Sequence, residues 1–247
     1  MKKILFAIAL AVVATACHTE NEGDVQFGKI AINTTTRAEV GDNDSTADKF
    51  VLGDYLLPNA KELKVEITGN GTTQTWESLD SFERAIEEGL TFASTLHTIT
   101  MSHGTKGVEG WSKPYFEGST SVEVPMYGLS VDADITVVLA NSIVEIETSK
   151  QFNGYFPTSK FQINGIDWDL SKRDMLFLNA GEATITCEAT RQTGKVTTLE
   201  SKIELKPTTR HKVVFELSTV GNAKVNVVFD NEIVETIELE FELNENA

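Results

Sequence analysis

The feature of this sequence that most constrains its fold is an alternation of apolar and polar residues that recurs from residue 25 onward. Successive side chains of a β-strand point to opposite faces, so this period of two predicts strands with one buried face. The clearest case is segment 237–243, in which four apolar residues alternate with three glutamates. The other strand-like runs cover residues 25–34, 63–68, 96–102, 121–126, 135–148, 160–163, 175–178, 183–189, 196–205, 212–217 and 224–229. Many short strands separated by Gly and Asn turns predict an all-β protein made of β-sandwiches.

The 231 residues from Cys17 onward are enough for one large domain or two small ones, and we expect two tandem sandwiches that divide near residues 147–152. We expect an N-terminal β-sandwich over residues 25–148 and a C-terminal β-sandwich over residues 149–247. One short helix interrupts the first, because Asp80 and Glu83 have the spacing of a capping box and Gly89 follows as a C-cap.

The N-terminus has the pattern of a lipoprotein signal peptide. Two lysines at positions 2 and 3 precede an apolar run over residues 4–14, which is too short to span a membrane. Segment 14–17, Ala-Thr-Ala-Cys, is similar to a bacterial lipobox. We therefore predict a signal peptide over residues 1–16 and a lipid, such as palmitate, on Cys17. The alternative is ordinary secretory cleavage after Ala16, which would leave Cys17 as a free thiol.

Charge and cysteine content exclude several classes of protein. Removal of residues 1–16 leaves 19 basic against 37 acidic residues, a formal charge of −18. Such a surface repels phosphate backbones, so no nucleic-acid partner is expected. Residues 17–24 are polar and acidic and are predicted to form a tether. With Cys17 lipidated, Cys187 is the remaining thiol, and we expect it to be a small buried residue of a strand.

The sequence carries no recognisable catalytic motif. Its four histidines lack metal-ligand spacing, and no nucleophile elbow or phosphate-binding loop is present. We expect no enzyme activity, no metal and no cofactor other than the covalent lipid. Trp111 and Tyr115 lie in an aromatic, turn-rich segment and are candidates for glycan contact, although packing in the core is the alternative.

Several segments together resemble a domain-of-unknown-function family of Bacteroidota surface lipoproteins, which are fimbrillin-like or cell-adhesion proteins. Besides the lipobox, the resemblance rests on Gly28–Ile32, Thr36–Ala38, Pro114–Gly118, Val137–Val144 and Phe152–Phe156. It implies that both sandwiches are transthyretin-like. It also implies that the acidic tether serves export to the cell surface, and that the protein resides on the outer membrane. Ser45 lies in a short pattern, Asp-Ser-Thr, at which such bacteria O-glycosylate exported proteins.

The resemblance further implies a way of assembling. Some fimbrillin-like proteins are cut after an arginine that follows the first strand, and a strand of another subunit then replaces the one removed. Arg37 and Ala38 stand at the comparable position, and the C-terminal strand is the candidate donor. We therefore expect a surface-anchored structural or adhesion subunit, with the membrane and other fimbrial subunits as partners. The alternative is a glycan-binding lipoprotein of a polysaccharide-uptake system.

Overall fold

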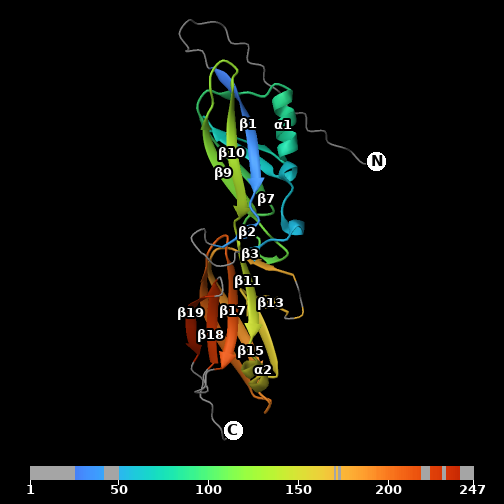
Figure 1. Ribbon diagram of the computed structural model, residues 1–247, viewed down its shortest axis with the longest axis vertical. Coiled ribbons are helices and arrows are strands. Elements are labelled where there is room, and N and C mark those ends of the chain that lie inside the picture. The colour runs from blue at the N-terminus through green and yellow to red at the C-terminus, as the bar shows by residue number, and fades with distance from the viewer. Residues whose placement is uncertain are drawn as a thin grey trace, which may run out of the picture.

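The computed structural model describes residues 26–41, 50–169, 171, 174–217, 223–229 and 232–239, with backbone alone from residue 223 onward. Two β-rich halves lie end to end along the long axis (Figure 1). The predicted signal peptide, tether and lipidated Cys17 lie outside the described residues, as do Ser45 and residues 240–247.

The N-terminal half is a single seven-stranded sheet whose two ends approach each other. Its strand order is β5-β4-β7-β9-β10-β1-β6. These strands are β1 (Phe27–Thr36), β4 (Lys64–Gly69), β5 (Thr72–Trp76), β6 (Phe92–Ala93), β7 (Leu96–His103), β9 (Phe116–Glu123) and β10 (Ser130–Leu139). Trp76 at one end of the sheet lies 6.3 Å from Phe92 at the other, measured between ring centroids. The sheet therefore encloses its own core, which contains Ile67, Ile99 and Ile135.

Helix α1 (Leu79–Glu87) closes the space between these two ends of the sheet. Its Phe82 is buried and lies 5.1 Å from Trp76 between ring centroids. The predicted capping box is wrong by two residues. The N-cap is Ser78, whose hydroxyl accepts a hydrogen bond from the Ser81 N–H at 3.1 Å, and the Ser81 hydroxyl accepts one from the Ser78 N–H in return. Asp80 lies inside the first turn instead and pairs with Arg84 at 3.0 Å.

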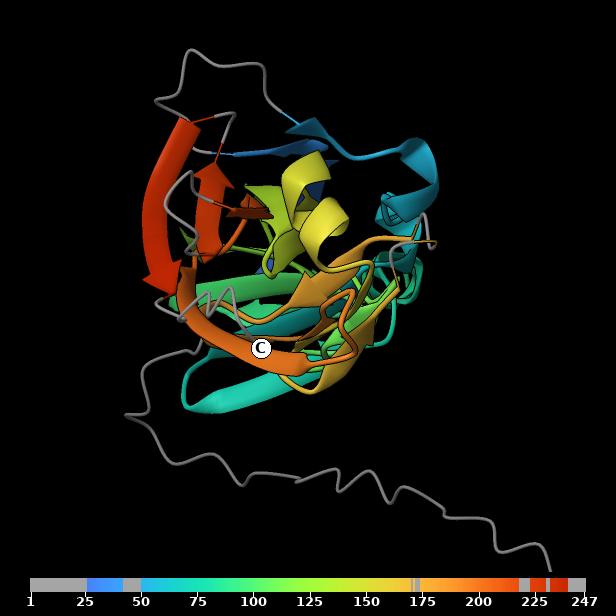
Figure 2. The ribbon, with the colours of Figure 1, turned by 90° about the horizontal axis from the view of Figure 1, so that it is seen from below.

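The C-terminal half is a sandwich of two sheets. A six-stranded sheet, ordered β19-β18-β17-β11-β14-β8, faces a four-stranded sheet, ordered β13-β12-β15-β16. The strands are β8 (Gly110–Trp111), β11 (Ser142–Thr148), β12 (Thr158–Ile163), β13 (Ile166–Trp168), β14 (Leu176–Leu178), β15 (Gly181–Thr190), β16 (Val196–Leu205), β17 (Arg210–Leu217), β18 (Ala223–Phe229) and β19 (Glu232–Leu239). A second short helix, α2 (Lys150–Tyr155), lies near the viewer in Figure 2 and contributes the buried Phe152 to this core.

The chain passes between the halves at residues 140–141. The run 135–148, expected as one strand, is two strands, β10 and β11, which belong to different sheets. The crossing therefore comes earlier than the predicted boundary at residue 148. The all-β class and the helix in the first half are confirmed, and the second half has the expected sandwich of two sheets.

The junction between the halves, here called the waist, contains β8, residues 140–141 and the hairpin formed by β2 (Glu39–Val40) and β3 (Phe50–Val51) (Figure 1). Two short 3₁₀ helices, Asp54–Leu56 and Ala60–Glu62, lead from this hairpin into the N-terminal half. β8 comes from a loop of that half but pairs with β14 of the other. Ile143 and Phe177, from the second half, in turn belong to the core of the first. The two cores are therefore joined by buried contacts.

Candidate functional site at the first strand and the waist

Strand β1 is held mainly along one edge. It pairs in parallel with β10 from Lys29 to Thr36. Along its other edge it pairs with β6 at Phe27 and Gly28 alone. The Asn33 side-chain amide also donates to Asp134 of β10 at 3.1 Å. Few hydrogen bonds other than this one ladder would have to break for β1 to leave the sheet.

The core contribution of β1 is also small. Ile30 is 1% exposed and Ile32 is half-buried, whereas the following residues are polar. Gly28 is buried because the chain passes close to the next loop at this point. A Cβ there would lie 2.2 Å from the Pro125 carbonyl oxygen. The strand therefore fits its place closely but buries little apolar surface.

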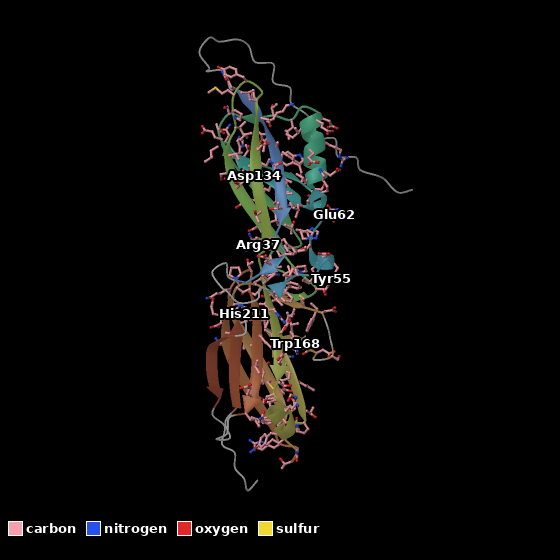
Figure 3. The ribbon with its side chains drawn as sticks, viewed as in Figure 1. Arg37, Tyr55, Glu62, Asp134, Trp168 and His211 are labelled. Carbon is pink, nitrogen blue, oxygen red and sulfur yellow. The ribbon has the colours of Figure 1, made fainter. Side chains whose placement is uncertain are left out.

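The candidate processing bond lies between Arg37 and Ala38, directly after β1, and reaches the waist (Figure 3). The N–H of Arg37 donates to the Val137 carbonyl at 2.9 Å, and the Ala38 carbonyl accepts from the N–H of Leu52 at 2.9 Å. Arg37 itself is half-buried. A protease binds an extended, freely accessible segment, so in the folded protein this bond is protected until the chain around it is released.

The segment after this bond is fixed independently of β1. The N–H of Gly41 donates to the Thr208 carbonyl of the second half at 2.8 Å. Phe50 of β3 stacks under Arg210, with 4.4 Å between the guanidinium carbon and the ring centroid. Arg210 also forms a bidentate pair with Glu145, at 3.2 and 2.6 Å. Chain scission after Arg37 would thus leave β1 held by its pairing with β10 and β6 alone, while the hairpin β2–β3 stays held at the waist.

The two aromatic residues predicted to contact glycans are packed into the fold. Trp111 packs against the second core, and its ring lies 4.9 Å from that of Trp168 at an angle of 44°. Its indole N–H donates to the Asp167 carbonyl at 3.3 Å. Tyr115 is 9% exposed. The rings of Trp111 and Trp168 are therefore not coplanar, Trp111 is half-buried and Tyr115 is buried, and glycan contact at Trp111 and Tyr115 stays a prediction.

Tyr115 instead takes part in a polar cluster that stiffens the waist. Its hydroxyl donates a hydrogen bond to the Glu117 carboxylate. Lys106 forms a salt bridge with the same carboxylate at 3.0 Å. Burial, together with this carboxylate, raises the pKa of Tyr115, and the hydrogen bond from Tyr115 lowers the pKa of Glu117. The phenol therefore stays protonated and acts as a donor.

A groove of about 630 Å³ runs along the waist beside this cluster. Its walls include Tyr55, Leu57, Pro58, Glu62, His103 and Pro114. Tyr55 is 82% exposed and lies at this level of the molecule, near Glu62 (Figure 3). The sequence did not single out Tyr55 or His103. The available signal near Tyr55 was a turn with Gly53 and Pro58, a composition shared by many surface loops.

A family model described as "Domain of unknown function (DUF4493)" matches residues 21–245. The chain belongs to this family. The predicted resemblance to a domain-of-unknown-function family of surface proteins is therefore confirmed at the level of family membership. A search of curated proteins found no match to this DUF4493 chain.

Solved structures similar to this DUF4493 protein include a fimbrial assembly protein from Parabacteroides distasonis. It shares 7% identity, with 86% of this chain and 98% of that chain covered, at a TM-score of 0.47. A protein from Bacteroides thetaiotaomicron, provisionally described as polysaccharide-binding, shares 8% identity over 89% of this chain and 100% of its own, at a TM-score of 0.43. At such identities these likenesses assign no function to the DUF4493 chain.

No metal centre is evident in the part of this DUF4493 protein that the structure describes. Within those residues, no three His, Cys, Asp or Glu side chains lie where they could share a metal ion. None of the described helices is long and apolar enough to cross a membrane. Three features of the described chain are therefore the candidates for a functional role. They are the weakly held β1, the bond after Arg37 and the waist groove.

Proposed function

We propose that the protein is a lipid-anchored surface subunit of a fimbria-like structural or adhesive assembly. The observation that carries this proposal is the position of β1. This strand follows directly on the predicted tether, is paired along most of its length on one side alone, and ends at Arg37–Ala38. Loss of β1 would expose the edge of β10, and an exposed strand edge accepts a strand from another chain.

A donor strand is available at the opposite end of the chain. β19 is the last strand in the order of the six-stranded sheet, so it has one neighbour, β18. Its sequence continues beyond Leu239 with the same alternation of apolar residues and glutamates. Such a strand suits a groove that is apolar inside and faces water outside. We therefore propose that the C-terminal segment of one subunit fills the place of β1 in the next.

The deciding experiment follows the N-terminus of the protein on cells. Wild-type protein is compared with Arg37→Ala and with the control Arg84→Ala, which changes another arginine with a 66% exposed side chain. We expect wild-type and control protein to yield a new N-terminus at Ala38 and ladders in unboiled gels. Arg37→Ala should retain an acylated Cys17 and run as one band. A wild-type protein that is monomeric, acylated and uncut would contradict the polymerising subunit.

The waist groove favours a second candidate function, the capture of glycan at the cell surface. An exposed tyrosine beside polar groups is a common arrangement in sugar-binding sites, because the ring stacks on the sugar while side chains bind its hydroxyls. Glycan arrays should then show binding that Tyr55→Ala abolishes. The matched control is Tyr127→Ala, since Tyr127 is 81% exposed and lies in another turn. Equal binding by both variants, or none by wild type, would contradict this function.

A further inference from the structure

The end of the molecule farthest from the waist carries a cluster of exposed apolar side chains. We call it the apolar tip and define it as Phe27, Leu96, Met126, Tyr127 and Leu129, with exposed fractions of 48%, 64%, 49%, 81% and 60%. These residues lie at the starts of β1, β7 and β10 and in the loop between β9 and β10. In Figure 1, β1 and β10 both begin at this end. Most of the large apolar side chains exposed in the described chain are therefore gathered in one place.

Backbone hydrogen bonds hold the segments of the apolar tip together. The N–H of Gly128 donates to the Phe27 carbonyl at 2.8 Å, and the N–H of Lys29 donates to the Leu129 carbonyl at 2.8 Å. The two segments thus pair where β1 and β10 begin. Leu96 lies opposite Glu123, the last residue of β9. The backbone of the apolar tip is consequently ordered, and it holds these side chains in exposed positions.

Tyr127 adopts a backbone conformation that is costly for its residue type. Its φ is +61°, and Gly128 follows at +72°. Two consecutive residues of positive φ suit a tight hairpin turn, for which Asn-Gly is the preferred pair and a bulky aromatic is not. Tyrosine gains no compensating contact inside the fold, because its side chain is 81% exposed. Residues held in such conformations cluster at functional sites, so the backbone of Tyr127 points to a role for this turn.

The length of chain before the described residues indicates what that partner is. Eight residues, 18–25, separate Cys17 from Gln26, which adjoins the apolar tip. Fully extended, they reach about 30 Å at most. A lipid on Cys17 therefore keeps the apolar tip within reach of the membrane for as long as the bond after Arg37 is uncut. We propose that the apolar tip docks into the surface of the lipid layer that holds Cys17, an inference that rests on the proposed lipid anchor.

The chemistry of the apolar tip fits this occupant. Tyrosine is favoured at the boundary between water and lipid, because its ring is apolar and its hydroxyl remains hydrated. Leucine, methionine and phenylalanine side chains enter the acyl region beside it. Glu123 at the rim, and the strongly acidic chain as a whole, favour zwitterionic over anionic headgroups. Docking would add a second point of attachment and orient the protein with its long axis away from the membrane.

The test places a fluorophore at Tyr127 and at its matched control, Tyr55. The two tyrosines are 81% and 82% exposed, and Tyr55 lies at the waist. Each is changed to Cys and labelled with a polarity-sensitive dye; the remaining thiol, Cys187, is fully buried. The acylated full-length variants are reconstituted in phosphatidylcholine vesicles with spin-labelled acyl chains. We expect a blue shift and quenching at position 127 and neither at position 55.

A second measurement separates docking from anchoring. Unlipidated protein, made as Cys17→Ser, should partition weakly into phosphatidylcholine vesicles. Tyr127→Ser with Leu129→Ser should lower that partition at least tenfold, since each large apolar side chain that enters lipid contributes about a factor of ten. The control pair is Tyr55→Ser with Val108→Ser, where Val108 is 41% exposed beside the waist groove, and it should leave the partition unchanged.

The outcomes distinguish failure of the apolar tip from failure of the lipid anchor. A water-like dye signal at position 127 on vesicles that retain the acylated protein would overturn the docking proposal. A blue shift that appears without vesicles and grows with protein concentration would overturn it as well, because a second copy would then cover the apolar tip. Absence of an acyl group from Cys17, seen by mass spectrometry, would contradict the anchor, while the unlipidated partition still decides the docking.

Discussion

His211 lies at the second position of β17, 4% exposed, and is held neutral by its surroundings. Its Nε2 accepts the N–H of Lys206 at 3.2 Å. Burial lowers the pKa of His211 to about 4, from an ordinary value of 6.5. Because the pKa of His211 is lower in the folded protein than in the unfolded chain, its contribution to the free energy of unfolding is fully present above pH 6.5. That contribution is lost as the pH falls from 6.5 to 4 and the unfolded chain takes up a proton first.

This linkage gives a prediction for His211→Gln. Two and a half pKa units correspond to about 3 kcal/mol in the free energy of unfolding. We expect the stability difference between wild type and His211→Gln to shrink by about that amount between pH 7 and pH 4. Urea unfolding at a series of pH values measures it, and subtracting the two proteins removes the effect of the shared carboxylates. A difference that is constant with pH would contradict the assignment.

Cys187 has the place expected for it, as a buried residue of strand β15. Burial raises the pKa of its thiol to about 12, so the reactive thiolate is scarce at neutral pH. We predict that a thiol reagent at pH 8 leaves the folded, acylated protein unmodified and modifies one thiol after unfolding in guanidinium. Rapid reaction of the folded protein would show that the second core opens locally.

The weak attachment of β1 gives a prediction for a whole strand. Ile30→Ala should cost about 2–5 kcal/mol and weaken β1 more than the rest of the sheet, because Ile30 is its one fully buried apolar side chain. We expect limited trypsin digestion at Arg37 to be faster in this variant. The control Ile99→Ala removes an equally buried side chain from the central strand β7. Equal acceleration in both variants would mean that cleavage follows global unfolding.

Which elements could be predicted from sequence depended on their length. The period of two identified most of the long strands, since one face of each is buried. Strands β2, β3, β6 and β8 have two residues each and are too short to show a period. Helix α2 has six residues, including Asn153 and Gly154, which are poor helix formers. In α1, Ser78 and Ser81 form the capping box. The prediction placed it two residues later, because Asp80 and Glu83 have the more familiar spacing of an acidic N-cap and a glutamate.

Pairing between strands is a property of the whole molecule and could not be read from sequence. The run 135–148 appears continuous, but Asn141 breaks it, because its side chain caps groups of another segment. It accepts the Tyr115 N–H at 3.1 Å and donates to the Lys113 carbonyl at 3.2 Å. The residues of the candidate sites also differ in how far the sequence could predict them. The position of Arg37 follows from its place after the first strand, whereas the exposure of Tyr55 and Tyr127 depends on loops that meet in three dimensions.

Asn141 also provides a test of how the two halves unfold. It is 2% exposed, so Asn141→Ala would leave buried groups at the waist without partners, at a cost of about 1–3 kcal/mol for each. We predict that wild type unfolds in one transition, seen equally by Trp76 and by the pair Trp111 and Trp168. In Asn141→Ala the two transitions should separate. Separate transitions in wild type would show that the buried contacts at the waist do not couple the halves.

The parallel pairing of β1 with β10 has a consequence for the order in which the chain folds. The bonded residues Asn33 and Asp134 are 101 positions apart, so the part of β1 beyond its short contact with β6 has no neighbour until about a hundred residues have followed it. Contacts between such distant positions form slowly. Under the proposed processing, the bond after Arg37 would be accessible to a protease during that interval, and it would become protected once Arg37 bonds to Val137 of β10. The extent of the proposed processing would then depend on the rate of folding relative to the rate of cleavage, and therefore on the concentration of protease.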